Sequence, residues 1–373
     1  MSCDKRLFTP GPLSTSETVK QAMLRDLASR DAEFVSLVKN IRHRLLELGN
    51  VADGSYEAVL MQGSGTFAVE SVLSSVIPKN GKLLVVINGA YGHRMAKIAT
   101  VLNIRCETIV FEEATPVQVE RVRARLAKDP TVTHVGTVHC ETSTGILNPL
   151  AELGRAVRER GGIFIVDAMS SFGGIPIDIA RDNVDFLVSS ANKCIQGVPG
   201  FAFVLGRRDL LQAADGCARS LSLDLLAQWK GFESDGQFRF TPPTHALLAF
   251  WQALQELEEE GGVEARARRY ALNQKVLIEG MSKLGFDAYL ALQHQSYVIT
   301  SFRYPRSAHF DFSVFYQRLS ELGFVIYPGK VSDADCFRIG TIGQIFPEDV
   351  RKLVAAVERV LSEMHIDSAP ALS

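Results

Sequence analysis

Two ionisable residues directly follow short apolar runs, where a buried strand would present a reactive side chain. Asp167 ends the run at residues 163–166, and Lys193 lies shortly after the run at residues 186–188. A carboxylate at a strand mouth with little water needs a cation or a donor. A lysine there can form a Schiff base with an aldehyde cofactor and, once released, can carry a proton between carbon atoms. Alone, Asp167 could equally be a helix N-cap. A lysine taken alone is far more often a solvated surface charge.

Two further strand ends carry residues suited to a flat, phosphorylated cofactor. The segment 62–66 contains Ser64, Gly65 and Thr66 before a helix-like stretch, and amides and hydroxyls at a helix N-terminus can bind phosphate oxygens. A plain tight turn explains this short segment equally well. Tyr91, in the segment 88–92, could lay its ring on an aromatic cofactor, although an isolated tyrosine more often packs at a domain seam. The combination with Lys193 and Asp167 favours the cofactor interpretation.

The segments that must position these residues alternate between two patterns. Apolar runs rich in Val, Ile and Leu predict buried parallel strands, at residues 57–61, 82–87, 105–111, 134–139, 163–166, 186–188 and 201–205. Amphipathic stretches between them predict helices, at residues 67–76, 91–102, 115–126 and 150–160. The pattern predicts an α/β domain with a helix-flanked, mostly parallel sheet.

The last third of the chain predicts a smaller α+β domain. A helical region spans residues 245–284 with a break at Gly261-Gly262, and strand-like runs follow at 297–302 and 324–327. We therefore expect a large domain over residues 1–245, whose residues 1–20 form an arm near the active site, and a small domain over 246–373.

Composition excludes several classes of protein. The 373 residues carry a net charge of -2, so no overall field favours nucleic acid or an anionic membrane. The most apolar helix-like segment, 246–254, is far shorter than the roughly 20 residues that span a bilayer. Six scattered cysteines without paired spacing favour a cytoplasmic location. His139 and Glu141 share one face of a strand but lack an evident third ligand, so no metal site is predicted.

The motifs resemble those of the fold-type I, class V pyridoxal-phosphate aminotransferases. Within that class they are most similar to the enzymes that move the amino group of 2-aminoethylphosphonate to pyruvate. The matching segments are residues 9–13, 62–65, 88–92, 167–176, 189–203, 219–224, 324–330 and 336–340. The resemblance covers nearly the whole chain and implies pyridoxal 5'-phosphate as the cofactor.

The resemblance also implies residue roles. Lys193 would hold the cofactor and Asp167 its ring nitrogen. Arg338 would bind the substrate anion, and Arg219 is a weaker candidate for the phosphonate. The remaining cofactor contacts would come from Ser64, Gly65, Thr66, Tyr91, Thr142 and Thr241. Thr241 is expected to reach the phosphate of a neighbouring subunit, because the class places its active sites at a homodimer interface.

The implied reaction is a ping-pong transamination that yields phosphonoacetaldehyde and L-alanine, in phosphonate degradation. Alanine:glyoxylate or serine:pyruvate aminotransferase activity is the alternative within the class, since residue spacing does not distinguish the amine donors. A non-catalytic nucleotide-binding or scaffold protein on a similar sheet is the alternative outside it, and it would require Lys193 and Asp167 to be incidental.

Overall fold

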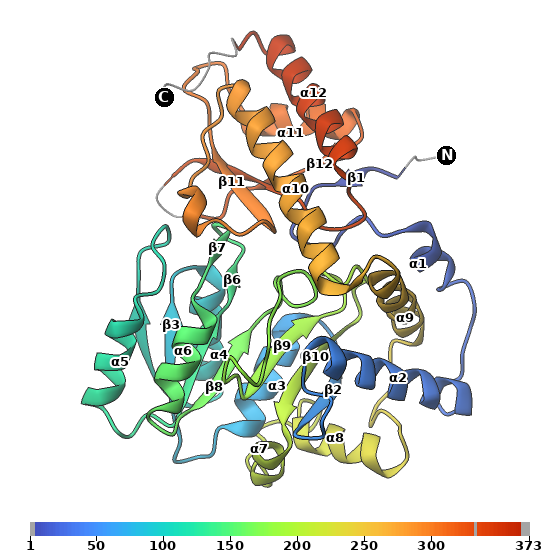
Figure 1. The fold of residues 1–373 in the computed structure, drawn as a ribbon, viewed down its shortest axis with the longest axis vertical. Coiled ribbons are helices and arrows are strands. Elements are labelled where there is room, and N and C mark those ends of the chain that lie inside the picture. Colours follow the sequence, from blue (N-terminus) through green and yellow to red (C-terminus); the bar gives the residue numbers. More distant parts are fainter. Residues whose placement is uncertain (1–3, 332–333, 367–373) are drawn as a thin grey trace.

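The larger part of the molecule is built on one mixed sheet. The computed structural model describes residues 4–331 and 334–366. The sheet has the strand order β2-β10-β9-β8-β5-β3-β4 and helices on both faces (Figure 1). Its strands are β2 (Tyr56–Gln62), β3 (Lys82–Ile87), β4 (Arg105–Val110), β5 (His134–Val138), β8 (Ile163–Asp167), β9 (Phe186–Ser190) and β10 (Phe201–Arg207). The predicted strands are confirmed to within about two residues at each end.

Strand direction departs from the prediction at one place. Strand β10 runs antiparallel to both neighbours, β2 and β9, whereas the other strands share one direction. The sheet is therefore mostly parallel, as predicted, but the run at residues 201–205, which was expected to be parallel, is antiparallel. Only residues 191–200 join it to β9, which is shorter than the crossover that parallel strands need. Strand β4 is also more exposed than predicted, because it lies at the sheet edge.

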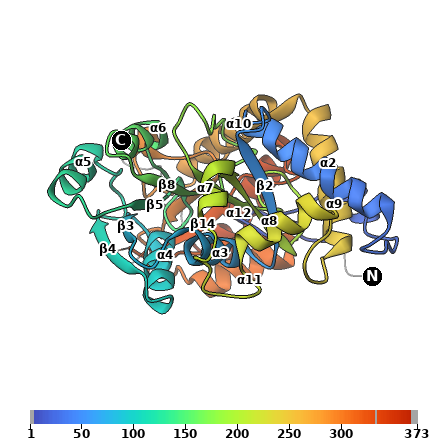
Figure 2. The same cartoon turned by 90° about the horizontal axis from the view of Figure 1, so that it is seen from below.

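Helices pack on this sheet in two groups (Figure 2). Helix α3 (Gly65–Val76) contacts three other helices, α4 (Ala90–Val101), α7 (Arg208–Ala213) and α8 (Leu225–Ser234). On the other side, α2 (Ala32–Leu48) packs with α9 (Thr244–Glu259), and α5 (Val119–Lys128) packs with α6 (Leu150–Arg158). In α6, Leu150, Leu153 and Val157 recur at helical spacing and are buried, which is why this face meets the sheet.

The remaining elements form a smaller α+β layer above the carboxyl ends of the large sheet (Figure 1). Its sheet has the order β11-β14-β13, and the N-terminal strand β1 pairs in parallel with β12. Its elements are α10 (Gly262–Lys283), β11 (Ile299–Arg303), α11 (Phe312–Glu321), β12 (Phe324–Val325), β13 (Tyr327–Pro328), β14 (Cys336–Gly340) and α12 (Pro347–Glu363), with β1 at Arg6–Leu7. Phe8 is buried in the core of this layer, so the first strand of the chain belongs to it. The remaining short elements among the described residues are α1 (Glu17–Gln21), the hairpin of β6 (Cys140–Glu141) and β7 (Ile146–Leu147), and the 3-10 helix η1 (Leu292–His294).

The boundary between the two layers is best drawn after α9. Leu247, Phe250 and Leu254 of this helix lie in the same hydrophobic cluster as the large sheet. We therefore propose a domain boundary at Gly261, whose φ of +102° ends α9 before α10 begins, rather than at residue 245. Within the described residues, no helix combines the length and apolar character that crossing a membrane requires.

Candidate active site

A cavity of about 210 Å³ lies beyond the carboxyl ends of the central strands. Ligands of open α/β sheets bind at this edge, where loops from several strands converge. Seven of the eight residues predicted to contact a cofactor line it: Ser64, Gly65, Thr66, Tyr91, Thr142, Asp167 and Lys193. Its wall also includes residues for which no role is predicted, among them Arg94, Met169, Ser190 and Asn192. The fold thus brings together residues as far apart in the sequence as Ser64 and Lys193.

The N-terminus of α3 forms the anion-binding end of the cavity. Ser64 is the N-cap residue, but its side chain makes no capping hydrogen bond, so its hydroxyl can serve a ligand. The first N–H groups of a helix have no intrahelical acceptor and favour a negative charge. Arg94 donates from Nη1 to the Thr66 hydroxyl at 3.2 Å, which adds a cation at this end. A Cβ at Gly65 would clash with the end of the Met169 side chain, so a larger residue there would require that side chain to move.

Asp167 is a buried carboxylate at the end of β8. Its Oδ1 accepts a hydrogen bond of 2.9 Å from the backbone N–H of Met169. Burial raises the pKa of Asp167 to about 6, against the opposing effects of that hydrogen bond and of the charges on Lys193 and Arg94. A cationic ligand atom beside this carboxylate would therefore be strongly favoured.

Lys193 lies in the loop between β9 and β10, and its amine is buried in the cavity. Nζ donates to the carbonyl oxygen of Pro10 at 2.7 Å. Gly11 has a φ of +122°, and a Cβ there would lie 2.7 Å from Nζ, so the N-terminal segment approaches the lysine as closely as glycine permits. Burial lowers the pKa of the Lys193 amine, which favours the neutral, nucleophilic form.

Tyr91 lies in the first turn of α4, between two cations. Lys330 Nζ is 4.4 Å and Arg94 Cζ is 4.8 Å from the centre of its ring. Burial alone would raise the pKa of Tyr91, but the charges of Lys330 and Lys193 outweigh it and lower that pKa. The tyrosine therefore has a strongly positive environment on the side that faces the small layer.

Glu141 holds the start of α4 in place, a role that no sequence motif indicated. Its carboxylate accepts hydrogen bonds from the backbone N–H groups of Tyr91 at 3.1 Å and Gly92 at 3.3 Å, and from the Ser143 hydroxyl at 2.9 Å. His139, in contrast, pairs through Nδ1 with the Ser171 hydroxyl at 2.9 Å. The two side chains thus serve different partners, and no group of three metal-ligating side chains occurs among the residues that the structure describes.

Arg338 lies on β14 and approaches the cavity from the small layer. It is buried, and it donates from Nε to the Pro328 carbonyl at 2.9 Å and from Nη1 to the Thr142 carbonyl at 2.8 Å. A guanidinium has five N–H donors, so these two bonds leave others for a ligand. The hydrogen bond to Thr142, a residue of the cavity wall, fixes Arg338 beside the site.

Two further predicted residues, like Arg338, are not part of the cavity wall. Arg219 donates from Nη1 to the carbonyl oxygens of Ser74 at 3.2 Å and Ile77 at 2.6 Å. These carbonyls are at the C-terminal end of α3, opposite the end that Ser64 caps, so Arg219 does not line this cavity and its predicted contact with phosphonate stays a prediction. Thr241 is exposed beside Phe240, and its predicted contact with a second subunit stays a prediction.

The residues present fit a phosphorylated pyridine aldehyde. The cavity offers a helix N-terminus for phosphate, an aromatic ring, a buried carboxylate and a buried amine. The Ser190 hydroxyl is also buried in its wall and has no hydrogen-bond partner among the described residues. Buried polar atoms rarely remain unpaired, so this hydroxyl is a further group that a polar ligand would satisfy.

The chain is similar to known aminotransferases. The family model described as aminotransferase class-V matches residues 14–319. A 2-aminoethylphosphonate–pyruvate transaminase of Syntrophobacter fumaroxidans is 56% identical over 353 residues, covering 94% of this chain and 95% of that protein. One from Vibrio vulnificus is 54% identical over 357 residues, covering 95% and 97%. The crystal structure of ureidoglycine-glyoxylate aminotransferase from Bacillus subtilis has a TM-score of 0.90 at 24% identity, covers 100% of this chain and 97% of that one, and shares the fold.

Proposed function

The chain belongs to the class V aminotransferase family, and from that membership we propose that it transfers the amino group of 2-aminoethylphosphonate to pyruvate. The products are phosphonoacetaldehyde and L-alanine, formed in two half-reactions at one site. The observation that carries the substrate assignment is identity above one half, over nearly the whole chain, to relatives named for this reaction. We also propose a cytoplasmic location.

We propose that the cavity holds pyridoxal 5'-phosphate. Ser64, Gly65 and Thr66 at the start of α3 would hold its phosphate, and Tyr91 and Asp167 would contact its ring. The cofactor supplies an aldehyde that captures amines and a ring that stabilises negative charge on the substrate carbon. Asp167 keeps the ring nitrogen protonated, because the cation relieves the cost of burying the carboxylate.

Lys193 has two tasks in this proposal. Its Nζ holds the cofactor between turnovers and, once displaced by the substrate amine, removes a proton from the carbon that bears that amine. The lowered pKa of Lys193 supports the second task, since only the neutral amine can accept a proton. The Pro10 carbonyl at 2.7 Å gives the released amine an acceptor that keeps it in the cavity.

Two cations form the proposed anion site. Arg338 can bind a carboxylate or a phosphonate bidentately. Lys330, beside Tyr91, provides a second positive charge on the same side of the cavity. A phosphonate carries up to two negative charges and three oxygens, whereas the carboxylate of pyruvate carries one charge and two. The second cation therefore supports a phosphonate donor in addition to the carboxylate that Arg338 alone would serve.

We propose that the working unit is a homodimer. Phe67 and Phe240 have exposed fractions of 52% and 43%, and the Gln62 amide joins their segments by donating to the Phe240 carbonyl at 3.0 Å. This apolar surface adjoins the phosphate-binding residues and Thr241. A second copy of the chain would cover it and bring Thr241 to the partner's cavity. Phe67→Asp should shift sedimentation toward the monomer.

The proposed function is tested by the absorbance spectrum of the cofactor-loaded protein. Addition of 2-aminoethylphosphonate without pyruvate should abolish the visible band of the lysine-bound cofactor, and pyruvate should then restore it. L-alanine and L-serine serve as comparison donors, and Lys193→Ala should lack both the band and turnover. If only alanine or serine abolishes the band, the phosphonate assignment is wrong and the alternative aminotransferase activity replaces it. If the wild-type protein has no such band, the role of Lys193 is wrong.

A further inference from the structure

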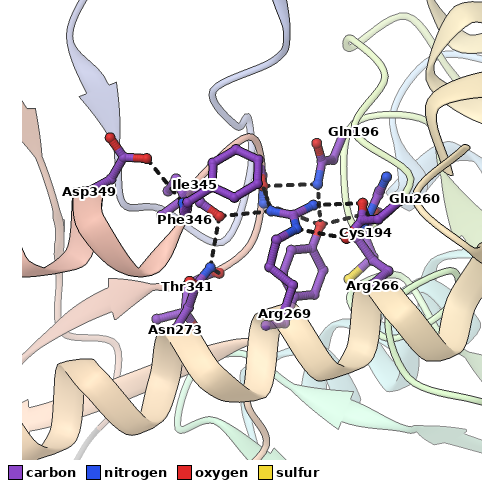
Figure 3. A network of polar contacts seen from close by, with 12 residues as sticks. Cys194, Gln196, Glu260, Arg266, Arg269, Asn273, Thr341, Ile345, Phe346 and Asp349 are labelled. Carbon is purple, nitrogen blue, oxygen red and sulfur yellow. Dashed lines mark hydrogen bonds and ion pairs between the residues drawn. The ribbon is translucent and has the colours of Figure 1, made fainter.

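The backbone that follows Lys193 is held by side chains of α10, a helix of the small layer (Figure 3). The Cys194 carbonyl accepts two hydrogen bonds, from Arg266 Nη1 at 2.8 Å and from the Tyr270 hydroxyl at 3.1 Å. Both donors are almost completely buried. This carbonyl belongs to the residue next to Lys193, so its direction helps to determine where the lysine side chain leaves the backbone.

Gln196 is held by the same helix in an unusual conformation. Its φ is +71°, a left-handed value that costs a residue with a side chain roughly 1–2 kcal/mol. Its amide donates to the Tyr270 hydroxyl at 2.6 Å and to the Gly343 carbonyl at 2.9 Å. The Tyr270 hydroxyl thus accepts from Gln196 and donates to Cys194, and it fixes the lysine loop at two points.

Ionic contacts hold the donors themselves in place. Glu260 accepts from Arg266 Nε at 2.6 Å and from Arg269 Nε at 2.7 Å. Burial would raise the pKa of Glu260, but the two arginines outweigh it and keep that pKa below its ordinary value. A carboxylate shared by two guanidinium groups restricts the rotamers of both arginines. The Arg266 side chain is therefore already held in the rotamer from which Nη1 donates to the Cys194 carbonyl.

The same helix also holds the strand that carries Arg338. Arg269 donates from Nη1 to the carbonyls of Gly343 at 2.9 Å and Ile345 at 2.8 Å. Asn273 donates to the Thr341 carbonyl at 3.1 Å. These carbonyls follow directly after β14, so α10 connects the loop of Lys193 with the strand of Arg338 through buried hydrogen bonds (Figure 3).

We infer that Tyr270 and Arg266 are positioning residues for Lys193. They set the direction of the Cys194 carbonyl, and with Gln196 they fix the backbone from which the lysine reaches the cavity and the Pro10 carbonyl. Since α10 also holds the end of β14, the network sets the position of the reactive amine relative to Arg338. The inference rests on the proposed function only for the role of Lys193 as the residue that bears the cofactor.

The test compares Tyr270→Phe with Tyr297→Phe. Tyr270→Phe keeps the ring and removes the hydroxyl that contacts Cys194 and Gln196. Tyr297→Phe is a matched control, because its hydroxyl lies in the same interdomain region but donates to the Gly174 carbonyl at 3.0 Å rather than to the backbone of the lysine loop. The readouts are the pH midpoint of the visible band of the lysine-bound cofactor without substrate, and kcat and KM with substrates.

Tyr270→Phe should shift the pH midpoint and lower kcat by on the order of ten- to a hundredfold with little change in KM, since small misplacements of a reacting group cost that much. Tyr297→Phe should leave all three quantities within about twofold of wild type. Arg266→Lys, which retains the charge and can restore one hydrogen bond, should lie between wild type and Tyr270→Phe.

Two outcomes would overturn the inference. One is a Tyr270→Phe protein whose midpoint and kcat match those of wild type. The other is an equal loss in Tyr297→Phe, which would assign the effect to general packing between the layers. Because the midpoint is measured without an amine donor, it does not depend on which donor is correct. Absence of the band from wild type would instead refute the proposed function.

Discussion

Asp167→Asn should make the cofactor-free protein more stable while it removes most of the activity. Burial raises the pKa of Asp167 from 3.8 to about 6 in the folded state. The folded protein therefore binds more protons than the unfolded chain between these pH values, and stability falls as pH rises through this window. A shift of this size corresponds to about 3 kcal/mol at pH 8, and to about half of that at pH 5. Asparagine has no charge to bury and can still accept from Met169.

The assay is thermal unfolding of the cofactor-free wild-type and variant proteins at both pH values. With an unfolding entropy of about 2.1 cal/mol/K per residue, the gain at pH 8 amounts to about 4 °C for 373 residues. Addition of pyridoxal 5'-phosphate should reverse the order, because only the wild-type carboxylate has a charge to pair with the ring nitrogen.

A suitable control is Asp185→Asn. Asp185 is also buried, but it pairs with Arg158 at 3.2 Å and Arg207 at 3.0 Å, so its loss should destabilise the protein at both pH values. The reasoning about Asp167 is refuted if its asparagine variant is no more stable than wild type at pH 8. It is equally refuted if the gain does not shrink at pH 5.

The further predictions concern four other residues. Arg338→Ala should raise the Michaelis constants of both anionic substrates. Lys330→Met should raise the Michaelis constant of 2-aminoethylphosphonate by about tenfold and that of pyruvate much less. Equal effects of Lys330→Met on the two constants in steady-state kinetics would remove Lys330 from the phosphonate site. Arg219→Ala should leave both Michaelis constants unchanged and cost about 1 kcal/mol in denaturant unfolding, because Arg219 serves the carbonyls at the end of α3. Burial lowers the pKa of His139 from 6.5 to about 4, so the unfolded state binds more protons in that window and stability falls with falling pH. Denaturant titrations at pH 7.5 and 5 should show that His139→Gln removes about 2 kcal/mol of this fall.

The sequence predicted the large sheet and the cavity because both depend on local patterns. Apolar runs followed by polar residues mark strand ends, and strands of one direction present those ends at one edge. The pattern therefore predicts one site that contains Ser64, Tyr91, Asp167 and Lys193. The direction of β10 was missed, since an apolar run has the same appearance in parallel and antiparallel strands.

The contacts that the sequence did not predict join distant segments. Arg219 belongs to a segment shared with the family, but its guanidinium contacts a carbonyl at the end of α3, which spacing along the chain cannot show. Glu141 was considered only as a metal ligand, although its role is to accept from the first N–H groups of α4. The close fit of Gly89 against the Glu141 side chain, where any Cβ would clash, is visible only in the structure.

The network on α10 could not be predicted for a related reason. Arg266 and Tyr270 lie on one face of an amphipathic helix, and by pattern alone they would be an ordinary surface charge and a core aromatic. Their partners are backbone carbonyls more than 70 positions away, and a carbonyl has no signature in the sequence. Recognition of such contacts requires coordinates.

The location of these groups separates chemistry from substrate choice. Lys193 and Asp167 are held by the large sheet, whereas Arg338 and Lys330 approach from the small layer. A shared fold does not determine the substrate, and Lys330, whose Nζ is 4.4 Å from the centre of the Tyr91 ring, is the side chain that we propose distinguishes the donors. Such side chains can change without disturbing Lys193 only if another element fixes the distance between the layers. The buried contacts of α10 with the lysine loop and with the end of β14 are suited to that task.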